Sequence, residues 1–182
     1  MRHPLEWIPS TSRKLALYVF LFLTISLFAV FRVLDQPLRT PAAPNGIVSF
    51  ELAGSPAVAQ SMLDSWNEQA KQYLAFGLGL DYLFMPTYAI ALGLAILLAA
   101  SRHAGWIKSL GAAAGWGAFV ATLFDATENF ALWKILLGEI IQQWTQLTAV
   151  CASIKFGLLI AGLVYVFVAA FLPAQRGAST KN

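Results

Sequence analysis

Four apolar stretches of membrane-spanning length constrain the fold of this chain more than any other feature. They occupy about residues 15–34, 78–100, 106–137 and 147–172. A helix needs about 20 apolar residues to cross the hydrocarbon core of a bilayer. Because lipid offers no hydrogen-bond partners, each stretch must close its backbone hydrogen bonds internally. The pattern predicts an all-α membrane protein, a four-transmembrane-helix bundle that forms a single domain over residues 1–182.

The composition agrees with a membrane location. Hydrophobic residues make up 58% of the chain and charged residues 12%, whereas soluble domains carry about 25% charged residues. No basic patch is interleaved with aromatic residues, so we expect the lipid bilayer and not a nucleic acid as partner. Cys151 is the single cysteine, and His3 and His103 both lie in polar flanks. We therefore expect no internal disulfide, no metal site and no cofactor.

Lysine and arginine positions predict the orientation of the bundle. With four spans, both termini and the loop between the second and third spans share one side. That side carries seven cations and one acid: Arg2, Arg13, Lys14, Arg102, Lys108, Arg176 and Lys181, against Glu6. Cytoplasmic loops carry an excess of such cations, so we expect both termini to be cytoplasmic. The expected location is a cell membrane, as a multi-pass protein of the bacterial inner membrane.

The first loop, residues 35–77, is the one sizeable extramembrane segment. The run GIVSFELAG at 46–54 is short enough for an extended segment or a small strand. Ser55 and Pro56 are typical of the N-cap and first residue of a helix. Apolar residues then recur at near-helical spacing: Val58, Met62, Trp66 and Tyr73. We predict a short amphipathic helix that caps the bundle or, alternatively, a lid that binds a partner or substrate.

Ionisable residues inside the predicted spans are the candidates for a buried polar cluster. Asp81 lies in the second span, Asp125, Glu128 and Asn129 lie in the third, and Lys155 lies in the fourth. From the helical rise, Asp125 and Lys155 each lie about 6 Å outward of their span's midpoint. Glu128 lies about 10 Å and Asp81 about 13 Å outward on the same reckoning. A lone charge at mid-bilayer costs about 2.5–3.5 kcal/mol, so we expect these side chains to meet inside the bundle.

The spacing of these residues indicates how they pair. Asp125, Glu128 and Asn129 are spaced i, i+3, i+4 and share one helix face, so Lys155 can pair with either acid. One cation cannot neutralise three carboxylates, and we therefore expect one of them to hold a proton near neutral pH unless water reaches it. Four further residues are candidates for supporting roles through a hydroxyl, a helix kink or a thiol: Tyr82, Tyr88, Pro86 and Cys151.

Small residues at four-residue spacing predict close helix packing. Gly111 and Gly115 form a GxxxG pattern at the start of the third span, and such patterns let helix backbones approach closely. We interpret the pattern as a contact within the bundle. A homodimer face, or a contact with another membrane protein, is the alternative.

Three classes of function fit these residues. The leading one is a non-enzymatic accessory or partner-binding component, in which the cluster holds the bundle together and no residue is catalytic. The second is a proton-coupled small carrier that uses Asp125, Glu128 and Lys155. The third is a membrane enzyme acting on a lipid-soluble substrate, with Asp125 or Glu128 as general acid or base. An open pocket lined by the cluster would favour a ligand-binding protein or an enzyme, and a fully packed core would count against both.

Overall fold

The computed structural model describes residues 1–173, and all of the regular structure in them is helical. Its long helices are α1 (Arg13–Leu34), α4 (Glu68–Ala100), α5 (Gly105–Leu136) and α6 (Gln142–Phe171). Each is long and apolar enough to cross a membrane, which confirms the predicted all-α class and indicates a membrane protein. Arg176 and Lys181, which the orientation argument uses, lie outside the described residues.

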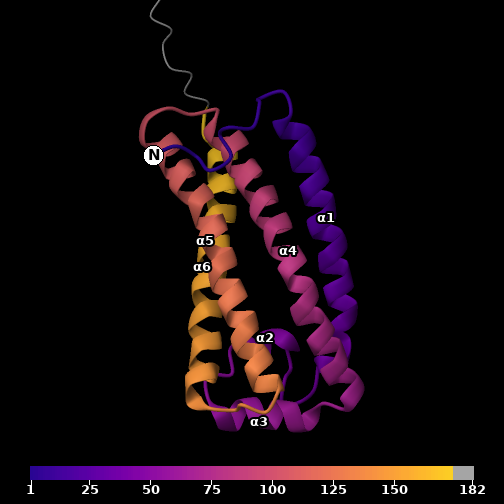
Figure 1. Ribbon diagram of the computed structural model, residues 1–182. Helices are drawn as coiled ribbons and strands as arrows, with labels where there is room; N and C mark the ends of the chain where they lie inside the picture. The colour runs from indigo at the N-terminus through magenta and orange to yellow at the C-terminus, as the bar shows by residue number, and fades with distance from the viewer. Residues whose placement is uncertain (174–182) are drawn as a thin grey trace, which may run out of the picture.

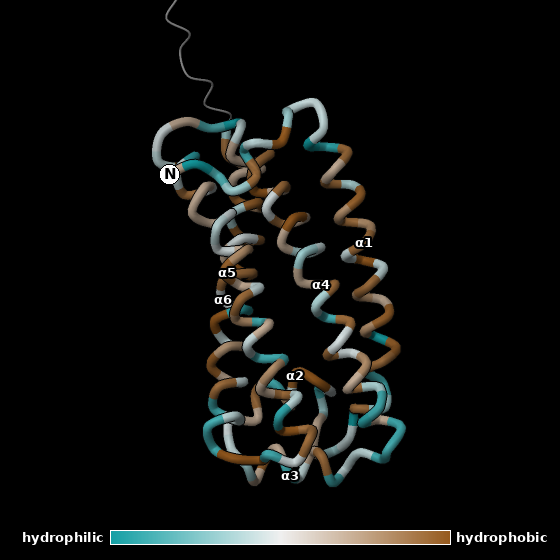
Figure 2. The backbone as a smooth tube through the Cα atoms, viewed as in Figure 1, coloured by the Kyte–Doolittle hydropathy of each residue, from teal (hydrophilic) through white to brown (hydrophobic). Residues whose placement is uncertain are grey.

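The four long helices lie side by side in an elongated bundle (Figure 1). α5 packs against both α4 and α6, whereas α1 packs mainly along α4. The N-terminus, the α4–α5 connection and the end of α6 lie at one end of the bundle, and α2 and α3 lie at the other (Figure 1). We call these the N-terminal end and the loop end. Hydrophobic residues follow the lengths of the helices, and hydrophilic residues gather at both ends (Figure 2).

Two of the long helices begin earlier than the hydropathy pattern predicts. α4 begins at Glu68 and not at residue 78, and α6 begins at Gln142 and not at residue 147. The side chain of Asn67 caps α4 by accepting a hydrogen bond of 2.8 Å from the backbone N–H of Ala70. The added turns of α4 are amphipathic, with Ala70 and Leu74 buried against the loop. Hydropathy locates only the apolar part of a helix, so it misses such turns.

The predicted extended segment at 46–54 is wrong, because residues Ile47–Glu51 form the short helix α2. A lone strand here would have no partner for its backbone groups, whereas a helical turn closes hydrogen bonds within itself. The carboxylate of Asp35 starts this helix by accepting a hydrogen bond of 2.8 Å from the N–H of Ile47. Gly46 precedes it with a φ of 60°, and a Cβ at that position would overlap the Asp35 carboxylate.

The rest of the loop closes the bundle at the loop end. A short 3-10 helix, η1 (Gln36–Leu38), precedes α2, and α3 (Pro56–Ser65) follows it. α3 starts as predicted, with Ser55 as N-cap, but it ends before Trp66, so Tyr73 belongs to α4. Trp66 adopts an extended backbone and donates its indole N–H to the carbonyl of Leu38 at 2.8 Å. Its ring packs edge-on against Phe50 of α2, with centroids 5.1 Å apart.

Both histidines are buried, although they lie outside the long helices, in the flanks where the sequence places them. His3 packs against α5 at Gly115, where an added Cβ would overlap the imidazole ring. His103 lies at the α4–α5 connection, and its Nε2 is 2.8 Å from the carbonyl oxygen of Ala169 in α6. The N-terminal segment therefore folds back onto the bundle.

The glycines of the GxxxG pattern serve two different contacts. A Cβ at Gly111 would overlap the hydroxyl of Tyr165 from α6 and approach Ala100 of α4 to 2.7 Å, so this glycine permits close helix packing. Gly115 instead makes room for His3. Both contacts lie within the chain.

Candidate functional site

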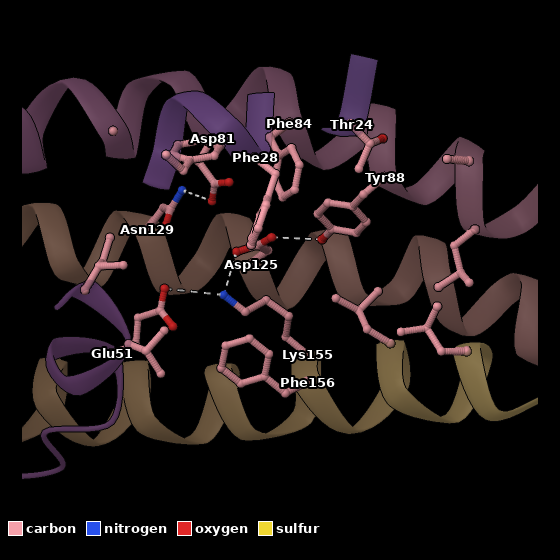
Figure 3. A pocket seen from close by; sticks show the side chains of 18 of the residues that line it. Thr24, Phe28, Glu51, Asp81, Phe84, Tyr88, Asp125, Asn129, Lys155 and Phe156 are labelled. Carbon is pink, nitrogen blue, oxygen red and sulfur yellow. Dashed lines mark hydrogen bonds and ion pairs between the residues drawn. The ribbon is translucent and has the colours of Figure 1, made fainter. Parts of the chain in front are cut away.

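Lys155 lies at the centre of a buried group of acids near the loop end of the bundle. Its Nζ donates to Asp125 Oδ1 at 3.0 Å and to Glu128 Oε1 at 2.9 Å. A third carboxylate oxygen, Glu51 Oε1, lies 3.8 Å from the same nitrogen. All four residues are more than nine-tenths buried. The ammonium group therefore bridges three acids that come from α2 and α5, of which Figure 3 shows Glu51 and Asp125.

The helix geometry explains why these groups meet. α5 is continuous from Gly105 to Leu136, so Asp125 and Glu128 lie one turn apart on one buried face of it. α6 packs along α5, which places Lys155 opposite that face. The long lysine stem also lets Nζ reach carboxylates at two heights on α5.

The remaining acid of the predicted cluster lies beside this group and not at the lysine. Asn129 donates its amide N–H to Asp81 Oδ2 at 2.8 Å and to the carbonyl of Leu78 at 3.3 Å. Tyr88 donates its hydroxyl to Asp125 Oδ2 at 2.8 Å. These bonds connect α4 to α5, so side chains from three long helices and from α2 form one polar layer.

The other predicted supporting residues lie apart from this layer. Tyr82 is about half exposed and donates its hydroxyl to the carbonyl of Ala126 at 3.3 Å. Pro86 is exposed inside α4, which continues to Ala100. Cys151 is buried one turn before Lys155 on α6. None of the three lines the pocket described next.

A partly open pocket of about 520 Å³ adjoins the polar layer. Five polar residues line it at the loop end: Glu51, Asp81, Asp125, Asn129 and Lys155. Beyond them the lining is apolar except for the hydroxyls of Thr24 and Tyr88, and it comes mainly from α1, α4 and α6 (Figure 3). On α6 the lining extends from Lys155 to Leu163, a rise of about 12 Å along the helix. The pocket is therefore polar at one end and apolar along the rest of its length.

Glu51 is the residue of this site that the sequence did not identify. The loop pattern placed it in an extended segment outside the bundle, yet it is 7% exposed and lines the pocket. Within the part of the chain that the structure describes, neither its Oε2 nor Oε2 of Glu128 has a hydrogen-bond partner. Glu128 is fully buried and does not line the pocket. The sequence does contain one indication that Glu51 is buried. Glu51 follows Phe50 inside an apolar run, whereas a solvated acid would be expected only at the end of such a run.

The donor set does not resemble a metal centre. Within residues 1–173 no three His, Cys, Asp or Glu side chains are arranged to hold a metal ion. The ammonium group of Lys155 occupies the position between the acids where a cation would lie. Comparisons of the chain with family models, with curated proteins and with solved structures find no match.

Proposed function

We propose that this membrane protein binds a single-chain amphiphile, with its head group at the polar layer and its chain in the apolar part of the pocket. The observation that carries the proposal is the pocket of about 520 Å³ with ionisable groups at one end. Small-molecule sites typically enclose about 300–1,000 Å³ with a few placed polar groups on a mostly apolar lining. The proposed role is binding and requires no reaction.

The size of the pocket argues against a cluster that serves only to hold the helices together. Protein interiors are packed about as densely as organic crystals, with few voids larger than a water molecule. A purely structural polar cluster would therefore be enclosed by packed side chains. Here Asp81, Asp125 and Lys155 instead line an open space next to Glu51, which has a free acceptor oxygen.

The arrangement of α1 supports entry from the side of the bundle. α1 packs mainly along α4, and it stands apart from α5 and α6 (Figure 1). Apolar residues line the pocket on both sides of this gap, with Leu21 and Phe28 on α1 and Leu159 and Leu163 on α6. A ligand already dissolved in the bilayer could therefore reach the pocket without crossing water.

A photoactivatable probe tests this proposal. The probe is dodecanol with a diazirine at the chain end, used with the protein in phosphatidylcholine nanodiscs. Gly77 lines the pocket, and an added Cβ there meets no atom within 4 Å, so Gly77→Leu is designed to occupy part of the pocket. Gly157→Leu on α6 is the matched control, because Gly157 is exposed and also has free space.

We expect the probe to label peptides that contain Leu21 and Leu163. Labelling should fall strongly in Gly77→Leu and stay unchanged in Gly157→Leu. Labelling confined to outward-facing residues such as Leu123, or labelling that does not change in Gly77→Leu, would contradict the proposal.

A proton-coupled carrier is the second candidate. It is favoured by the partnerless oxygens of Glu51 and Glu128, since a carboxyl with a free buried oxygen can hold a proton there. This candidate predicts pH-dependent uptake of a solute into proteoliposomes, and Glu128→Gln should abolish that uptake while the protein stays folded. Uptake that is independent of pH, or that persists in Glu128→Gln, would refute it.

A further inference from the structure

We infer that the head group of this amphiphile is a primary ammonium. The inference rests on the proposed function and names the ligand class of the same pocket. Three observations lead to it: the balance of charge at the polar layer, the free acceptor on Glu51, and the aromatic rings around the polar end of the pocket.

The charge balance favours a cation. Three acids line the pocket, Glu51, Asp81 and Asp125, and the buried Glu128 adds a fourth to the polar layer. Lys155 is the one cation among the described residues that line the pocket. Uncompensated charges in a medium of low dielectric are costly. A second ammonium group offsets part of this excess. A carboxylate or phosphate head group would add to it, and Lys155 already donates to Asp125 and Glu128.

Glu51 favours a head group that can donate a hydrogen bond. The residue lines the pocket and is 7% exposed, and its buried Oε2 has no hydrogen-bond partner among the described residues. Leaving a buried acceptor unpaired costs free energy that a donor recovers. A primary ammonium supplies both a positive charge and N–H donors. A quaternary ammonium supplies only the charge, and a hydroxyl supplies only a donor.

Aromatic rings complete a surface suited to a cation. Phe28, Phe84, Tyr88 and Phe156 line the pocket near the acids (Figure 3). The Lys155 ammonium already lies over the Phe156 ring, 4.8 Å from its centroid. Ammonium groups are attracted to aromatic faces at such distances. The polar end therefore combines carboxylates with ring faces, which is how proteins bind organic cations.

Competition among matched head groups tests the inference. Four unlabelled dodecyl compounds compete with the diazirine probe in nanodiscs: the primary amine, the trimethylammonium, the alcohol and the carboxylate. Each is compared at its measured mole fraction in the membrane, so that differences in partitioning cancel. A charge-assisted hydrogen bond to a buried group predicts that the primary amine competes at a mole fraction roughly ten- to a hundredfold lower than the alcohol.

The expected order is the amine first, the trimethylammonium next, then the alcohol, with the carboxylate last. Glu51→Gln should remove most of the advantage of the amine over the alcohol. Glu68→Gln, which changes an exposed acid at the loop end, should keep it. If Glu51→Gln does not fold, Asp81→Asn takes its place and should reduce the same advantage.

The outcomes separate this inference from the proposed function. If the probe labels the pocket but the amine and the alcohol compete equally, or the carboxylate competes best, the inference is overturned and the proposed function stands. If the trimethylammonium competes as well as the primary amine, the requirement for a hydrogen-bond donor is overturned. If no compound competes and the probe does not label the pocket, the proposed function fails as well.

Discussion

Replacing Lys155 by methionine removes the cation from the polar layer and keeps an unbranched stem of similar length. The lysine Nζ lies 3.0 Å from Asp125 Oδ1 and 2.9 Å from Glu128 Oε1, and both acids are almost fully buried. Removing one partner of a buried ion pair costs about 3–5 kcal/mol, because the other charge is left uncompensated. We therefore expect Lys155→Met to lower the free energy of unfolding by about 3–5 kcal/mol.

A triple variant makes the physical reason testable. In Asp125→Leu, Glu128→Met, Lys155→Met the three central charges are removed together and the volume is nearly kept. Buried ion pairs can often be replaced by apolar residues with little loss of stability. The hydroxyl of Tyr88 loses its acceptor on Asp125, which costs about 1–3 kcal/mol. We therefore expect the triple variant to be more stable than Lys155→Met, although it carries more changes.

Unfolding by SDS in dodecylmaltoside micelles, followed by circular dichroism, measures these differences. The control is Lys71→Met, which breaks an exposed 3.2 Å pair with Glu68 and should cost less than about 1 kcal/mol. If the two Lys155 bonds were ordinary interhelical hydrogen bonds, their loss would cost only about 1 kcal/mol, at about 0.6 kcal/mol each. A loss that small in Lys155→Met, or a triple variant less stable than the single one, would refute the reasoning.

Two further predictions concern the N-terminal segment. Gly115→Ala should destabilise the bundle by about 1–3 kcal/mol, since the new methyl group overlaps His3. Adding His3→Ala should recover most of this loss in the same SDS titration. If the double variant recovers no stability, the contact between Gly115 and His3 is contradicted. Burial lowers the pKa of His3 from 6.5 to about 4. As the pH falls, the unfolded chain therefore binds a proton at His3 at a higher pH than the folded protein does. Stability should therefore be fully present above pH 6.5 and fall as the pH drops toward 4. His3→Gln should lack that part of the pH dependence, and an unchanged profile would contradict it.

The four long apolar helices could be predicted because a bilayer would impose one simple requirement on each of them. About 20 apolar residues with internally closed hydrogen bonds are visible in the sequence without knowledge of their neighbours. The start of α4 at Glu68 was not predicted, because the first turns of the helix have one polar face and one face packed against the loop. Their mean hydropathy is therefore lower than that of a membrane-spanning stretch. Such turns are decided by packing against the folded loop, which hydropathy does not describe.

The polar layer was partly predictable for a similar reason. Depth along the helix and the cost of a lone charge indicated that Asp125, Glu128 and Lys155 would meet, and they do so in the structure. Glu51 could not be placed in this way, because a loop residue has no depth until the loop folds. Its position depends on α2, a five-residue helix too short to show a periodic pattern. The burial of His3 depends in the same way on a segment outside the spans.

The position of Lys155 in the chain has a consequence for biosynthesis. Lys155 belongs to α6, the last of the long helices to leave the ribosome, whereas all four acids of the polar layer are translated earlier. A nascent chain that ends before α6 therefore carries its acids into the translocon without their counterion. Arrival of the final helix supplies the lysine that offsets part of this negative charge, so the polar layer cannot form until synthesis of the chain is nearly finished.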